Sequence, residues 1–175
     1  MFHGWENFYV MLGSAAGSLI GLMFVVVTLT AGLDRAMASR GQDLYMTPTI
    51  ASFGIILAVS AATLAPGVPR LTLSVIVAVG ALAGMAAALR AMAGIMRPRP
   101  SGIQPHWSDA WLYGACPAFV FAALIGAAAG LAASAGWSAY ALAALLVILL
   151  LVCIRNAWDL ITAIAPARRN NPGGP

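Results

Sequence analysis

Long stretches without any charged residue most constrain how this chain can fold. No Asp, Glu, His, Lys or Arg occurs in residues 7–33, 47–69, 71–89 or 110–154. A helix needs about 20 apolar residues to cross the hydrocarbon core of a bilayer, and each stretch is about that long or longer. Because 62% of the 175 residues are hydrophobic and only 8% are charged, little material is left for a water-facing domain. We therefore predict an all-α integral membrane protein.

Polar links and helix breakers divide these stretches into five predicted spans. The sequence Pro66-Gly67-Val68-Pro69 ends the second span, since its prolines lack backbone donors and its glycine can turn freely. Ser134-Ala135-Gly136 is short enough to join the last two spans as an antiparallel hairpin. The predicted spans are 8–32, 48–65, 71–89, 111–133 and 137–154, and the third helix can continue to Met96. Together they form one transmembrane helical bundle, residues 1–165, with a tail, 166–175, that we expect to be flexible.

The arginines predict the orientation of the bundle. Cytoplasmic loops of membrane proteins are enriched in Lys and Arg. With five crossings and the N-terminus outside, only Arg70 falls on the outer side. The other eight fall on the cytoplasmic side: Arg35, Arg40, Arg90, Arg97, Arg99, Arg155, Arg168 and Arg169. Trp and Tyr occur near the predicted span ends, where amphipathic rings prefer to lie. We therefore expect an outside N-terminus and a cytoplasmic C-terminus, in a bacterial-type inner membrane.

Glycines spaced by four predict close helix–helix packing. Helices in lipid do not associate by hiding apolar surface from water. Their association depends instead on close packing, which small residues allow because they let two backbones approach. The spacing occurs in three spans, at Gly13, Gly17 and Gly21, at Gly80 and Gly84, and at Gly126 and Gly130. On the first span the glycines share a sector of about 100° with Glu6, Ser14 and Thr28. We interpret the later pairs as packing within one subunit, and the first face as a contact with another subunit.

The last span has a different character. Residues 145–152, Leu-Leu-Val-Ile-Leu-Leu-Leu-Val, are bulky throughout. Lipid-exposed surfaces are bulky and apolar, whereas helix interfaces in membranes favour small residues. We therefore expect this segment to face lipid.

Several kinds of chemistry lack the residues they need. A proton relay needs an ionisable group within the membrane, and none lies at depth here. The two histidines, His3 and His106, fall on opposite sides, which disfavours a bis-histidine haem. A catalytic site needs a general acid, a general base and a nucleophile close together, and no such set lies at one depth of the predicted membrane bundle. We therefore expect no enzymatic activity, no cofactor and no metal site, and the dispersed arginines argue against nucleic-acid binding.

Four small polar groups remain as candidates. His3 and Glu6 could hold a metal or line a pore mouth, although a solvated terminal pair is the simpler interpretation, since a metal site needs three or four ligands. Arg155 and Asp159 lie one turn apart and can pair, either as a membrane-anchoring helix end or as a polar clasp to another helix. Cys116 and Cys153 fall near the cytoplasmic ends of adjacent helices, and we expect free, packed thiols. Residues 106–111 are typical of an interfacial helix start, with Ser108 or Asp109 as N-cap.

Two functions are compatible with these features. The first is a non-catalytic subunit or scaffold of a larger membrane assembly, associating with lipids, with copies of itself or with other membrane subunits. The alternative is a homo-oligomeric channel or facilitator in which the first helix lines the path. In that case Gly13, Gly17, Gly21 and Thr28 lie along it, and a ring of Glu6 carboxylates forms its outer mouth.

Overall fold

All regular elements in the described part of the chain are helices. The structure, a computed structural model, describes residues 4–30, 46–96 and 111–169, and the side chains of 4–28, 46–96 and 111–159. Five regions within it are long and apolar enough to cross a membrane, which confirms the five predicted helices. The elements are α1 (Glu6–Thr30), α3 (Thr47–Leu64), α4 (Arg70–Met96), a π-helical turn η2 (Trp111–Ala115) that leads into α6 (Cys116–Ala132), and α7 (Ser138–Arg169).

Two helices are longer than the apolar stretches from which they were predicted. Helix α4 continues past residue 89 to Met96, as the sequence allowed. Helix α7 continues past residue 154 to Arg169, so helical backbone includes residues 166–169 of the expected tail, while 170–175 lie outside the described residues. The thickness of a bilayer sets the number of apolar residues that a spanning helix needs, but the helix itself can continue beyond that apolar stretch.

Turn residues at the helix ends explain where the chain reverses. Gly67 has φ +73°, a left-handed conformation that costs glycine little, and it lies between the end of α3 and the start of α4. Between α6 and α7, Ser134 adopts φ +58°, and the Ala135 N–H donates to the Gly130 carbonyl at 2.9 Å. That bond satisfies a carbonyl at the end of α6, so the short 134–136 connection forms the predicted hairpin.

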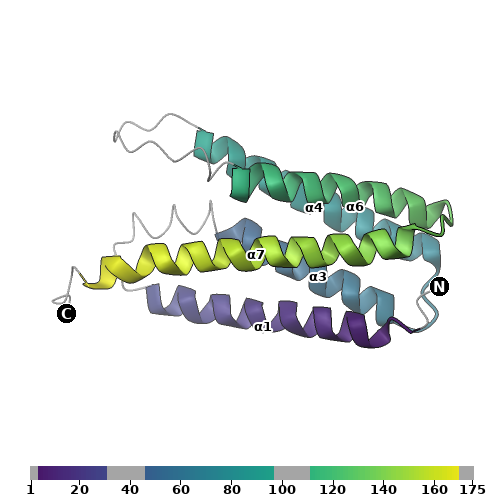
Figure 1. The fold of residues 1–175 in the computed structure, drawn as a ribbon, viewed down its shortest axis with the longest axis horizontal. Coiled ribbons are helices and arrows are strands. Elements are labelled where there is room, and N and C mark those ends of the chain that lie inside the picture. The colour runs from purple at the N-terminus through teal and green to yellow at the C-terminus, as the bar shows by residue number, and fades with distance from the viewer. Residues whose placement is uncertain (1–3, 31–45, 97–110, 170–175) are drawn as a thin grey trace.

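Successive helices run antiparallel, and α3 and α7 lie in the middle of the bundle (Figure 1). Helix α1 packs on α3 and α7 on one side. Helices α4 and α6 pack against each other on the other side, with α4 also touching α3 and α6 also touching α7. Helix α1 begins and α7 ends at opposite ends of the bundle, as expected for an odd number of helices.

The central position of α7 corrects one prediction. Leu146 and Leu149 are fully buried, while Ile148 and Leu151 are 45% and 59% exposed. The bulky segment is therefore exposed along one side only, and its other side forms part of the core. Sequence could not separate the two sides, because equally bulky residues occupy both.

Helix α1, in contrast, lies at the edge of the bundle. Within its most apolar 18 residues only 22% are buried, compared with 44% in the α6 and α7 regions. Its inner side carries Tyr9, Leu12, Ala16 and Met23, all at most 1% exposed. Its other side is open in the described part of the chain, and the large side chains there are between 48% and 65% exposed: Val10, Met11, Leu22, Phe24 and Val25.

Candidate functional site

The exposed side of α1 is small and weakly polar along its middle, between exposed Val10 and Val25. Ser14, Ser18 and Gly21 are exposed and Gly17 is half-buried, and these four residues lie within about 100° around the helix. A Cβ added at Gly17 or Gly21 would meet nothing within 4 Å. The Ser18 hydroxyl donates to the Ser14 carbonyl at 2.8 Å, so it needs no outside acceptor. We call Ser14, Gly17, Ser18 and Gly21 the α1 outer face.

The exposed side of α4 provides a comparison within the same chain. Leu71, Val75, Val79 and Leu82 are between 53% and 66% exposed. Lipid tails are as apolar as these branched side chains, whereas a stretch of glycines and serines offers a neighbouring lipid fewer atoms to contact. The two exposed sides therefore differ in shape and polarity, although both lie in apolar helices.

Most of the remaining predicted glycines lie against other helices of the same chain. A Cβ at Gly13 would meet Ser60 of α3 at 3.3 Å, and one at Gly80 would meet Ile55 of α3 at 3.2 Å. Gly84 lies under the Phe121 ring of α6, so closely that an added Cβ would overlap the ring. A Cβ at Gly130 would meet the Trp137 ring at 2.9 Å. At Gly126 it would meet nothing within 4 Å.

The charged candidates lie on the surface. Glu6 is exposed at the first turn of α1, and Thr28 is exposed near its other end, where its hydroxyl donates to the Phe24 carbonyl at 2.9 Å. Arg155 and Asp159 form an ion pair at 2.6 Å with side chains 53% and 38% exposed. An exposed pair of this kind contributes only a few tenths of a kcal/mol.

The other candidates can be placed only in part. Cys116 and Cys153 are free thiols, the first half-buried and the second buried. In residues 4–30, 46–96 and 111–169, no group of three or more His, Cys, Asp or Glu is placed to hold a metal ion. His3 and the segment 106–110 lie outside the described residues.

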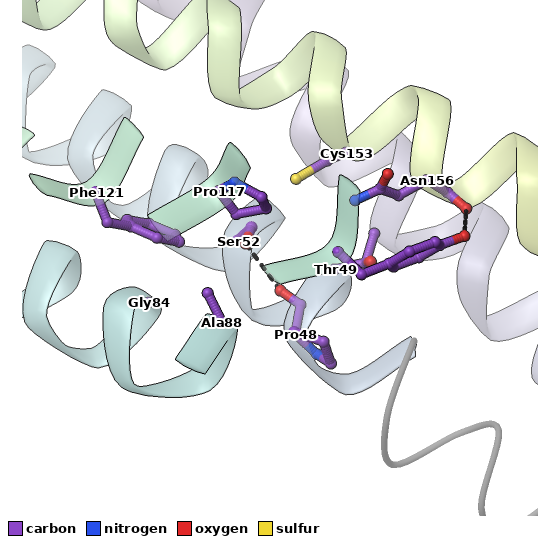
Figure 2. Close-up of a pocket in the computed structure, with 10 residues that line it drawn as sticks. Pro48, Thr49, Ser52, Gly84, Ala88, Pro117, Phe121, Cys153 and Asn156 are labelled. Carbon is purple, nitrogen blue, oxygen red and sulfur yellow. Dashed lines mark hydrogen bonds between the residues drawn. The ribbon is translucent and has the colours of Figure 1, made fainter. Parts of the chain in front are cut away.

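A buried polar pocket lies where α3, η2 and α7 meet. Five polar side chains line it, each at most 7% exposed: Thr49, Ser52, Tyr113, Cys153 and Asn156. Apolar groups, including Gly84, Ala88 and Phe121, close the side toward the bundle core. Figure 2 shows the Cys153 and Asn156 side chains pointing from α7 toward Ser52 and Thr49 of α3. We call this cavity the polar pocket.

Asn156 links α7 to the π-helical turn through two hydrogen bonds. Its amide Nδ2 donates to the Leu112 carbonyl at 3.1 Å, and its backbone carbonyl accepts from the Tyr113 hydroxyl at 2.9 Å, which is drawn in Figure 2. A π-helical turn disturbs the regular pattern of backbone hydrogen bonds and often occurs at functional sites. The Asn156 amide supplies a donor to a carbonyl in this irregular segment.

The polar pocket is small and not fully satisfied. The space open to the centre of a water-sized sphere is about 10 Å³, which is room for about one water molecule. The Asn156 Oδ1 atom is buried and has no hydrogen-bond partner among the described residues. A buried acceptor without a donor costs about 1–3 kcal/mol.

Little in the sequence points to this pocket. Thr49, Ser52 and Asn156 are uncharged, so the pattern of charges does not mark them. The usable signal was the amide of Asn156, which follows directly on the apolar stretch of α7, since a buried amide needs hydrogen-bond partners. Comparison of the chain with protein-family models, with curated proteins and with solved structures finds no match.

Proposed function

We propose that this chain is a non-catalytic subunit of a larger membrane assembly and that it binds a transmembrane helix of another subunit through the α1 outer face. The observation that carries the proposal is the contrast between the middle of the exposed side of α1 and the large exposed side chains of α4. The α1 outer face consists of Ser14, Gly17, Ser18 and Gly21, whereas the exposed side of α4 consists of branched side chains such as Val75 and Val79.

Physical chemistry favours a helix over lipid as the neighbour of such a face. Where Gly17 and Gly21 lack side chains, a second backbone can approach closely, and many weak dispersion contacts add up. Exposed Phe24 and Leu22 flank the face and would surround the incoming helix. The hydroxyls of Ser14 and Ser18 can also accept hydrogen bonds, which contribute on average about 0.6 kcal/mol each between membrane helices.

The proposed orientation places the start of α1 outside and the end of α7 in the cytoplasm of a bacterial-type cell. Arg90 and Arg155 lie toward the same end of the antiparallel bundle, and Arg70 lies toward the other, which supports the positive-inside assignment. Cysteines introduced as Glu6→Cys and Arg168→Cys should react with membrane-impermeant reagents from opposite sides. Labelling of both from one side would overturn the five-crossing topology.

Leucine substitution tests the association directly. Gly17→Leu and Gly21→Leu place branched side chains where the backbones should meet, so we expect loss of the native complex in mild detergent. Gly126→Leu is the matched control, because that glycine is also exposed and also has open space around its Cβ position. Loss of assembly in the α1 variants alone supports the proposal. An unchanged native mass in Gly17→Leu shows that the face is not an association surface.

The channel is the second candidate, and it is favoured by the exposure of both Glu6 and Thr28 on α1. Gly13 is covered by Ser60 of α3, so a path along α1 would run beside Gly17 and Gly21. Purified protein in liposomes separates the two functions. Ion flux that disappears with Glu6→Gln would support the channel. Absence of flux together with a co-purifying partner would support the subunit.

A further inference from the structure

We propose that residues 111–115 form a hinge with two helical registers, and that the Asn156 amide holds this hinge in the π-helical one by replacing a backbone donor that Pro117 lacks. This inference is independent of the association through α1. It begins with the position of Pro117, which follows the π-helical turn η2 by two residues and lies in the first turn of α6. A proline has no backbone N–H to donate.

The π-helical pattern leaves one carbonyl of η2 without a donor. In a π-helix the carbonyl of residue i accepts from the N–H of residue i+5. The pattern therefore assigns the Cys116 N–H to the Trp111 carbonyl. For the next carbonyl, that of Leu112, the donor position falls on Pro117. Ala115 has helical angles, φ −64° and ψ −47°, so η2 continues directly into α6, and the Leu112 carbonyl needs a donor from outside its own helix.

Asn156 supplies that donor from α7. Its Nδ2 atom lies 3.1 Å from the Leu112 carbonyl oxygen, and its side chain is 3% exposed. Pro117 and Asn156 both line the polar pocket, so the residue without a donor and the residue that compensates for it lie at the same place in the bundle (Figure 2). The Tyr113 hydroxyl donates in return to the Asn156 backbone carbonyl at 2.9 Å. Two hydrogen bonds therefore tie consecutive residues of η2 to one residue of α7.

The ordinary α-helical register is the alternative state of this segment. There the carbonyl of residue i accepts from the N–H of residue i+4. Leu112 would then pair with Cys116, and the Tyr113 carbonyl would be the one that faces Pro117. Each register thus leaves one carbonyl without a donor from its own helix. Asn156 is bonded to the carbonyl that the π-helical register leaves over, so it favours that register.

The packing of η2 on α4 shows what a change of register would move. A Cβ added at Gly114 would come within 2.6 Å of the Met92 Cβ and 3.2 Å of its Cα, so the turn lies directly on α4. One residue of a helix corresponds to a rotation of about 100°. Release of the hinge would therefore rotate the start of this helix against α4. That start carries Trp111, whose side chain is 54% exposed.

A double-mutant cycle tests the compensation. Pro117→Ala restores an N–H at the position where the π-helical pattern needs one, so the Leu112 carbonyl no longer depends on the amide. In full-length protein in mixed micelles, Asn156→Leu should lower the equilibrium constant for folding at least about fivefold more with Pro117 present than in the Pro117→Ala background. The control is Tyr113→Phe, whose effect should be the same in both backgrounds. Equal effects of Asn156→Leu in the two backgrounds would overturn the proposal.

Hydrogen exchange at the amide decides the question if Asn156→Leu does not fold. Selective ¹⁵N labelling of asparagine reports on the side-chain amides of Asn156 and of Asn7, which is exposed. The Asn156 Nδ2 hydrogens should exchange with D2O at least about tenfold more slowly than those of Asn7. In Pro117→Ala the restored N–H competes for the same carbonyl, so exchange at Asn156 should become at least about threefold faster. Equal rates at Asn156 and Asn7, or a rate at Asn156 that Pro117→Ala leaves unchanged, would contradict the proposal.

Discussion

Adding one methyl group at Gly84 should destabilise the bundle, while the same change at Gly126 should not. A Cβ at Gly84 would overlap the Phe121 ring, which is 1% exposed and held between α4 and α6. A buried ring cannot rotate away without displacing its neighbours, and overpacking of this kind typically costs about 1–3 kcal/mol. At Gly126 the added methyl group meets nothing within 4 Å.

The expected magnitudes follow from opposing effects. Alanine is favoured over glycine in a helix by about 0.5–1 kcal/mol, and this gain shrinks if the unfolded chain stays helical in detergent. Gly126→Ala should therefore change the free energy of unfolding by 0 to about +1 kcal/mol. Gly84→Ala should lower it by about 1–2 kcal/mol, since overlap outweighs propensity. Reversible unfolding in mixed detergent micelles, followed by tryptophan fluorescence, measures both.

A double-mutant cycle isolates the cause. Phe121→Ala removes the ring and creates a cavity at a cost of about 3–5 kcal/mol. In that background the methyl group at residue 84 has space, so Gly84→Ala should no longer destabilise. A Gly84→Ala variant as stable as Gly126→Ala would refute the close approach of α4 and α6. The close approach would also be refuted if Gly84→Ala still lowered the free energy of unfolding in the Phe121→Ala background.

Three further substitutions test individual polar contacts by the same unfolding assay. Ser74→Ala removes the buried 2.7 Å bond to the Ala128 carbonyl and should cost about 0.6 kcal/mol, whereas a cost above about 2 kcal/mol would mean that more than this bond is lost. Tyr113→Phe deletes the hydroxyl bonded to the Asn156 carbonyl and should cost about 0.5–1.5 kcal/mol; no change would show that the bond is not formed. Asp159→Asn breaks an exposed ion pair and should change stability by less than about 0.5 kcal/mol, and a larger loss would point to a contact beyond Arg155.

The helices could be predicted from the sequence because a membrane requires long apolar runs, which are visible residue by residue. Breakers such as Gly67 marked the turns for the same local reason. The rotation of each helix about its axis could not be predicted. Leu146 and Leu151 have the same side chain, yet one is buried and the other exposed, because only the neighbouring helices distinguish them.

The glycines illustrate the same limit. Gly17 and Gly84 occur in similar four-residue patterns, but one has open space and the other lies under a ring. The polar pocket was harder still to foresee, since it joins Ser52, Tyr113 and Asn156 from three distant segments. Uncharged polar residues are common in apolar helices, so their convergence appears only after the helices are packed.

Disulfide cross-linking from the α1 outer face tests the proposed association most directly. A cysteine at Ser18→Cys, in a chain without native cysteines, should cross-link in native membranes under mild oxidation. The product would be either twice the mass of the 18.0 kDa chain or an adduct with a different subunit. The control is Val79→Cys, which is exposed on the bulky side of α4 and should remain monomeric. Cross-linking at Ser18 alone is the predicted result, with the second thiol supplied by residue 18 of another copy or by a cysteine of the other subunit; equal cross-linking at both positions would contradict the account.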